Sequence, residues 1–116
     1  MSLFSGQRAW AVQRLSALVL LAYAAGALLR LAFGPAPTYA AWQAWAAKPL
    51  GMSLLLILAG AVIVHAWVGL RDVALDYLRP TGLRLAVLGI AGTGFLALGA
   101  WILALLASHA ISHPAL

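Results

Sequence analysis

The stretch LAVLGIAGTGFLALGAWILALLA, residues 85–107, decides the fold of this chain because it contains no charged residue. Residues 50–70 form a second apolar stretch with one histidine and no formal charge, and residues 15–33 form a third, interrupted only by Arg30. Each stretch is close to the roughly 20 residues that a helix needs to cross the hydrocarbon core of a bilayer. Lipid offers the backbone no hydrogen-bond partner, so we expect these stretches to be α-helices.

The composition supports the same conclusion, since 66% of the residues are hydrophobic and only 8% are charged. The sequence therefore predicts an all-α integral membrane protein, a single membrane domain over residues 1–116, with three spans at about 12–33, 50–75 and 83–107. The first stretch is too long for a typical signal peptide and lacks a clear cleavage site, so we expect a permanent span. The chain has no cysteine, which excludes disulfides and iron–sulfur clusters within it.

The segments between the predicted spans carry turn and interface signals. Gly34-Pro35-Ala36-Pro37 ends the first span, because proline and glycine break a helix. Residues 38–47 then place aromatic side chains at near-helical spacing, which predicts a short amphipathic segment on the membrane interface. The second helix is expected to continue past the membrane core to about Leu78, and residues 79–82 are expected to form a turn.

The third predicted span carries a row of small residues. Gly89, Thr93 and Ala97 are spaced by four and share one helix face, which favours close contact between helices in lipid. The residues after this span, 108–116, are expected to form a short frayed tail.

Basic residues are distributed unevenly along the chain, which has a formal charge of +5. Those on one predicted side of the membrane are Arg8, Arg14, Arg71, Arg79 and Arg84. The other side has only Arg30 and Lys48. Positive residues favour the cytoplasm, so we expect a cytoplasmic N-terminus and a C-terminus on the outer side of the membrane. This topology accounts for the positive charge without nucleic acid as a partner.

His65 lies near the middle of the second predicted span, where an ionisable group is costly and usually functional. Ala61, His65 and Gly69 lie one helical turn apart, so small residues flank the imidazole and leave room for a flat ligand. Asp72 and Asp76 return to nearly the same face, and Asp76 is about 16 Å from His65 along the helix axis. The spacing leaves three roles open for His65: an axial ligand of haem b, a proton relay, or a hydrogen bond between helices.

Other polar residues near the spans are given no cofactor role. His109 and His113 follow the third span and are expected to be solvated tail residues, so the second axial ligand of a haem would come from another subunit. Ser16 is expected to hydrogen-bond within its own helix, without a function.

The cytoplasmic end of the second helix carries Asp76 and Tyr77. A tyrosine hydroxyl can donate a hydrogen bond to a quinone carbonyl while its ring packs against apolar tails, and an adjacent aspartate can orient it or deliver protons. The alternative is an interfacial anchor, with Asp76 paired to Arg79 or Arg84. Arg14, at the start of the first span, would meet a haem propionate or extend toward lipid phosphate.

These residues resemble the hydrophobic membrane anchor of succinate dehydrogenase, respiratory complex II, specifically its D-type subunit. The specific part of the match is His65-Ala66-Trp67-x-Gly69, followed by Asp76-Tyr77. Arg14-x-Ser-Ala and Thr38-Tyr39-x-x-Trp42 also fit, as do the three-span layout and the orientation. The resemblance covers essentially the whole chain.

The resemblance implies a subunit that is not catalytic alone, within an oxidoreductase that passes electrons from succinate, in the tricarboxylic acid cycle, to ubiquinone in the respiratory chain. His65 would bind the iron of haem b, with the opposite histidine from the cytochrome b556 (C-type) subunit, a second three-helix anchor. Arg14 would lie near a haem propionate, Tyr77 would contact the ubiquinone head group, and Asp76 would line that site. The two anchors would hold the iron–sulfur and flavoprotein subunits on the cytoplasmic face of a bacterial cytoplasmic (inner) membrane. This chain would cross that membrane as a multi-pass protein with a periplasmic C-terminus.

Two alternatives follow from the same residues. One is a fumarate reductase-type anchor without haem. The other is a small membrane scaffold or transport component in which His65 and the two aspartates relay protons. Arg71 and Asp72 lie outside the motif, and we expect an ion pair or a docking contact there.

Overall fold

The structure is a computed structural model that describes residues 6–113 of the chain. Within that range it consists of helices: α1 (Gly6–Phe33), α2 (Tyr39–Ala47), α3 (Pro49–Tyr77) and α4 (Thr81–Ser112). Three of them, α1, α3 and α4, are long and apolar enough to cross a membrane. The prediction of an all-α chain with three spans is therefore confirmed.

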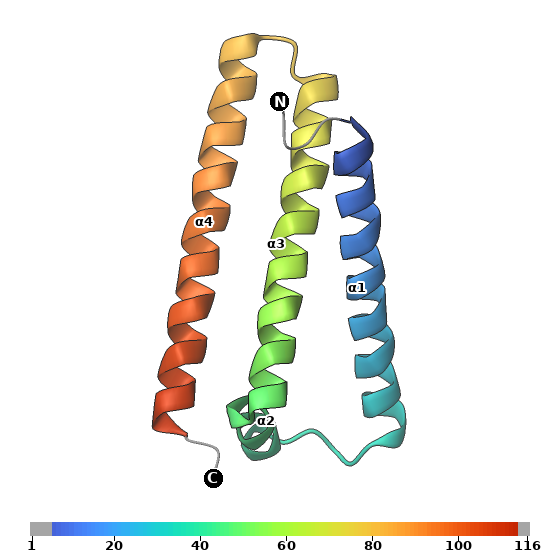
Figure 1. Cartoon of the computed structure of the whole chain (residues 1–116), viewed down its shortest axis with the longest axis vertical. Helices are drawn as coiled ribbons and strands as arrows, with labels where there is room; N and C mark the ends of the chain where they lie inside the picture. The colour runs from blue at the N-terminus through green and yellow to red at the C-terminus, as the bar shows by residue number, and fades with distance from the viewer. Residues whose placement is uncertain (1–5, 114–116) are drawn as a thin grey trace.

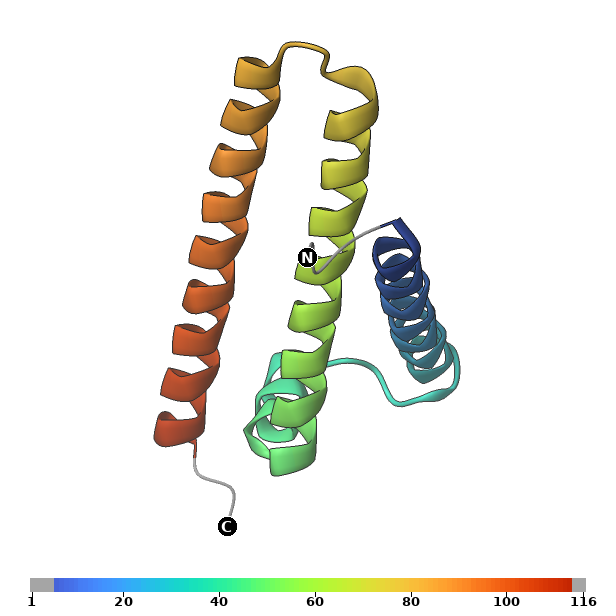
Figure 2. The same ribbon diagram turned by 45° about the horizontal axis from the view of Figure 1, so that its top comes forward.

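The central helix is α3, with α1 on one side and α4 on the other (Figure 1). α4 runs almost alongside α3, whereas α1 leans away from α3 when the molecule is turned (Figure 2). The start of α1 and the turn between α3 and α4 lie at one end of the bundle, which we call the arginine-rich end. α2 lies at the opposite end, beside the start of α3, and we call this the α2 end.

The helix boundaries follow from local sequence chemistry. Pro49 occupies the first turn of α3, where its missing N–H is not needed, and Pro80 precedes α4. α2 begins after Thr38, whose side-chain oxygen accepts a hydrogen bond from the Ala41 N–H at 3.2 Å. The predicted interfacial segment is therefore a helix. α2 also packs tightly on α3, since a Cβ atom on the buried Gly51 would overlap the Trp45 carbonyl.

The helices extend beyond the predicted spans. α1 begins at Gly6 rather than near residue 12, and α3 ends at Tyr77, within one residue of the expected end. The frayed tail predicted from residue 108 is wrong as far as Ser112, because α4 continues to that residue. Residues 1–5 and 114–116, which belong to the predicted lead and tail, lie outside the described residues.

The contact between α3 and α4 is apolar. Trp67 of α3 meets Phe95 of α4 edge to face, with ring centroids 6.5 Å apart. A Cβ atom on Gly92 would lie 3.3 Å from the Trp67 ring, and one on Gly99 would lie 3.4 Å from the Ile63 side chain. Small residues of α4 thus accept large side chains of α3.

The small-residue face predicted on α4 is not the one that α4 uses within this chain. A Cβ atom on Gly89 would meet nothing within 4 Å, and Thr93 and Ala97 are exposed. The contact with α3 uses the neighbouring row that contains Gly92, because periodicity alone does not say which face meets which helix. α4 has no buried residue at all, so most of its apolar surface remains available to lipid or to another chain.

Candidate functional site

The contact between α1 and α3 contains a polar pair at its centre. Ser16 of α1 is buried, with 7% of its surface exposed, and its hydroxyl oxygen lies 3.1 Å from Nδ1 of His65 on α3. The same hydroxyl donates to the backbone carbonyl of Gln13 at 3.0 Å. The helix–helix hydrogen bond that the sequence left open for His65 is therefore present on Nδ1. The expected hydrogen bond of Ser16 within its own helix is thus present, and the hydroxyl also contacts a second helix, which the sequence did not indicate.

One turn further along α3, Gly69 faces the Gln13 side chain. A Cβ atom on Gly69 would lie 3.3 Å from Gln13 Nε2. Gln13 Oε1 is enclosed and has no hydrogen-bond partner among the described residues. The open space that we expected beside Gly69 is thus occupied by α1, and Gly69 is small because a helix packs there.

The other ring nitrogen of His65, Nε2, is available. It has no hydrogen-bond partner among residues 6–113, and it is not among the enclosed polar atoms. Ser16 and α1 lie on the Nδ1 side of the ring, so Nε2 is directed away from them. A neutral imidazole binds a metal through one nitrogen while the other makes a hydrogen bond. The described residues contain no group of three or more metal-ligating side chains, so a metal at His65 would take further ligands from outside this chain.

Asp76 and Tyr77 end α3 at the arginine-rich end. Tyr77 is the last residue of the helix and is 79% exposed, and Asp76 is exposed beside it. Within the described part of the chain, Asp76 makes no ion pair with Arg79 or Arg84, so that alternative is not observed. The quinone role of Asp76 and Tyr77 stays a prediction.

Arg71 and Asp72 form the ion pair that the sequence left open, with 2.9 Å between a guanidinium nitrogen and a carboxylate oxygen. Half of the Asp72 side-chain surface is exposed, and such a pair contributes little to stability. Arg14, on α1, is exposed and lies over the Trp10 ring at 5.1 Å from its centroid. This cation–π contact holds the guanidinium near the arginine-rich end without an ion pair in the described residues.

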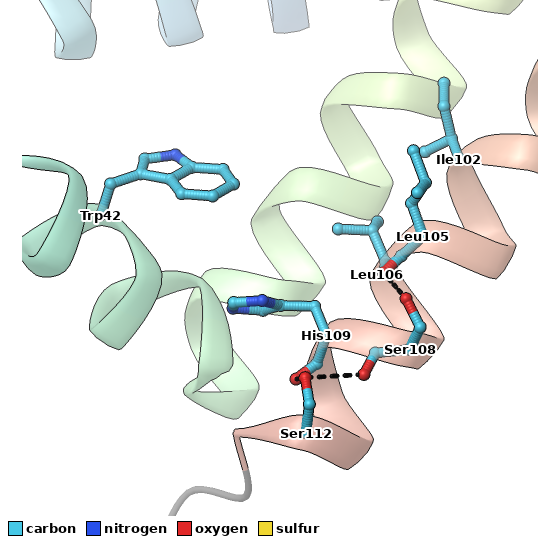
Figure 3. Close-up of a pocket in the computed structure, with 7 residues that line it drawn as sticks. All are labelled: Trp42, Ile102, Leu105, Leu106, Ser108, His109 and Ser112. Carbon is cyan, nitrogen blue, oxygen red and sulfur yellow. Dashed lines mark hydrogen bonds between the residues drawn. The ribbon is translucent and has the colours of Figure 1, made fainter.

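A pocket at the α2 end changes our interpretation of His109 (Figure 3). The residues that line it are Trp42, Ile102, Leu105, Leu106, Ser108, His109 and Ser112. His109 is half-buried, and its Nε2 lies 3.2 Å from the Gln43 backbone carbonyl oxygen. Its ring centroid is 6.1 Å from that of Trp42 and 4.9 Å from that of His113. His109 is therefore part of the contact between α2 and α4, and the expectation of a solvated tail residue is wrong.

Sequence reasoning missed Gln13 and Ser16 as neighbours of the site. Both are polar residues three positions apart on α1, and this spacing puts them on one helix face. That signal could have marked a polar face inside an apolar span. It could not have shown that the face meets His65, because the pairing joins two distant segments of the chain.

The fold and site together define a multi-pass helical membrane protein with a half-buried histidine in its central span. Residues 3–105 match the family described as succinate dehydrogenase/fumarate reductase transmembrane subunit. The chain is also similar to the succinate dehydrogenase hydrophobic membrane anchor subunit of Coxiella burnetii (strain RSA 493 / Nine Mile phase I). The two are 30% identical over 82 residues, which cover 71% of each chain. The chain belongs to this family of membrane anchors. Family membership sets aside the transport component considered from the sequence.

Proposed function

We propose that this chain anchors succinate dehydrogenase in the bacterial inner membrane and provides His65 as one axial ligand of haem b. The observation that carries this proposal is the geometry of His65. Its Nδ1 is engaged by Ser16, and its Nε2 is unpartnered and accessible in the middle of a span. An ionisable side chain at that depth is energetically costly, and such residues usually have a function.

The residues present fit half of a bis-histidine haem site. A neutral imidazole with a hydrogen bond on Nδ1 is the form in which histidine binds iron through Nε2. The second ligand would come from the C-type cytochrome b556 anchor. That subunit would pack on the exposed apolar surface of α4 and of the other spans. When bound, the haem supplies one-electron transfer at a potential that the protein tunes.

Arg14 is suited to hold a propionate of that haem. It precedes Ser16 by two positions, about 3 Å along the α1 axis, on the side of the arginine-rich end. Its guanidinium is exposed, and guanidinium groups bind carboxylates through paired hydrogen bonds. A propionate that extends from the level of His65 toward this end would reach it.

Tyr77 and Asp76 are suited to bind a quinone, such as ubiquinone, at the arginine-rich end. The Tyr77 hydroxyl has no partner among the described residues and can donate to a quinone carbonyl. The exposed Asp76 carboxylate can orient the tyrosine or accept and deliver protons for quinone reduction. The arginine-rich end would face the cytoplasm, where the iron–sulfur and flavoprotein subunits would dock.

The test uses the complete complex, purified with its partner subunits in mild detergent. We expect a b-type haem spectrum that His65→Ala abolishes, because the iron loses an axial bond. His109→Ala is the matched control, since it removes a histidine at the α2 end and should leave the spectrum intact. A complex without haem would instead identify a fumarate reductase-type anchor, and a spectrum unchanged in His65→Ala would remove His65 as a ligand.

The quinone site is tested in the same preparation. Tyr77→Phe removes only the hydroxyl, so it should lower succinate–quinone reductase activity roughly 10- to 100-fold and leave the haem spectrum unchanged. Tyr39→Phe removes an exposed hydroxyl at the α2 end and serves as the control. Unaltered quinone kinetics in Tyr77→Phe would contradict the assignment of Tyr77.

A further inference from the structure

We infer that Ser16 is a positioning residue for His65: it accepts a hydrogen bond from Nδ1–H and thereby fixes the tautomer and the orientation of the imidazole. The inference rests on the proposed ligation of haem iron by His65. It assigns a role to a residue of α1, a helix that itself contributes no iron ligand.

The direction of the hydrogen bonds follows from counting hydrogens. The Gln13 carbonyl can only accept, so the 3.0 Å contact requires the Ser16 hydroxyl to donate its single hydrogen there. The same hydroxyl oxygen must then accept at its 3.1 Å contact with His65, so Nδ1 carries the hydrogen. A neutral imidazole has one N–H, and Nε2 is therefore left with the lone pair that a metal needs.

The position of α1 is fixed by a second hydrogen bond. The Tyr23 hydroxyl donates to the Leu54 carbonyl of α3 at 2.6 Å. Tyr23 follows Ser16 by about two helical turns, whereas Leu54 precedes His65 by about three. These opposite directions along the chain are those expected for two antiparallel helices. Two bonds separated along the contact prevent α1 from sliding, so Ser16 stays at the level of the imidazole.

The burial of Ser16 determines how much the loss of its hydroxyl should affect His65. Only 7% of the Ser16 surface is exposed, so water does not readily take the place of the hydroxyl as the hydrogen-bond partner of Nδ1. A hydrogen bond to the distal nitrogen of a ligating histidine orients the ring and raises its basicity, and its loss typically costs 10- to 100-fold in metal affinity. A less basic ligand also stabilises oxidised iron less, which raises the midpoint potential of the haem.

The test compares four substitutions in the purified complex: Ser16→Ala, Ser16→Val, Ser16→Thr and Ser53→Ala. Ser16→Ala and Ser16→Val should release haem to excess apomyoglobin about 10- to 100-fold faster and should shift the midpoint potential upward. Ser16→Thr keeps the hydroxyl in the shape of valine and should retain both properties. Ser53→Ala removes an α3 hydroxyl that donates to the Pro49 carbonyl of its own helix, so it should change neither.

Haem release and potential equal to wild type in Ser16→Ala would overturn the inference. Equal losses in Ser16→Thr and Ser16→Val would also overturn it, because the role would then be packing rather than hydrogen bonding. This pair remains decisive if the alanine variant fails to assemble. A wild-type complex without haem, or haem retained in His65→Ala, would instead overturn the proposed function.

Discussion

The two contacts that α3 makes with its neighbouring spans differ in chemistry. Against α1 it makes two hydrogen bonds, Ser16 with His65 and Tyr23 with Leu54. Against α4 it packs Trp67 on Phe95 and Gly92, and no side-chain hydrogen bond joins these two helices in the described residues. Lipid is as apolar as the side chains, so the α3–α4 contact depends on packing, whereas hydrogen bonds fix how α1 and α3 face each other. His65, the proposed haem ligand, lies in the contact with the stronger orientational constraint.

The comparison predicts the largest loss when the apolar contact is emptied. Trp67→Ala removes the ring that fills the space between Phe95 and Gly92, and it should lower the free energy of unfolding by up to about 3 kcal/mol. SDS titration of the purified complex measures this quantity. Trp101→Ala, which removes an α4 ring that is 67% exposed, is the matched control. Equal losses in the two variants would show that the ring between α3 and α4 contributes no more to the free energy of unfolding than an exposed ring does.

Adding one methyl group to each contact distinguishes a rigid neighbour from a flexible one. Gly60→Ala meets nothing within 4 Å and should raise the free energy of unfolding by up to about 1 kcal/mol through helix propensity. Gly92→Ala presses on the Trp67 ring and should lie about 1 kcal/mol below Gly60→Ala. Gly69→Ala presses on the flexible Gln13 side chain and should fall between them. The same titration ranks the three, and a reversed order of Gly92→Ala and Gly69→Ala would refute the distinction.

The smallest effect is expected for a hydrogen bond remote from the proposed haem site. Tyr23→Phe removes the bond to the Leu54 carbonyl and should lower the free energy of unfolding by about 0.6 kcal/mol, the average for such bonds between membrane helices. The spectrum of the proposed haem should not change, because the Ser16–His65 hydrogen bond remains. A loss as large as that of Trp67→Ala would show that this polar contact contributes as much to stability as the apolar contact does.

The spans could be predicted because the length of an apolar stretch has to match the thickness of the bilayer core. The uncharged stretch at residues 85–107 lies inside α4. Helix length was less predictable, since backbone hydrogen bonding continues past the apolar residues to Ser112. The same limit explains the error at His109, which was assigned to a tail that is in fact helical. His65 was found because a lone ionisable residue in a span is conspicuous.

The neighbours of His65 could be predicted less well than its position within the second span. Helical spacing correctly put Gly69 on the face of His65, but it did not show that Gln13 of α1 covers that glycine. Likewise, the regular spacing of small residues on α4 pointed to Gly89, yet it is Gly92 that contacts Trp67 of α3. Which faces of two helices meet depends on side-chain shape over many residues, and a single sequence does not encode that in a local signal.

The connections on either side of α3 have a consequence for how strong each contact needs to be. Only Leu78, Arg79 and Pro80 separate α3 from α4, so the tether keeps α4 beside α3 at an effective concentration on the order of millimolar or higher. A weak apolar contact suffices under that constraint. α1 is joined to α3 through residues 34–38, α2 and Lys48, a longer path that confines it less. The two hydrogen bonds of α1 thus supply the order that its tether does not.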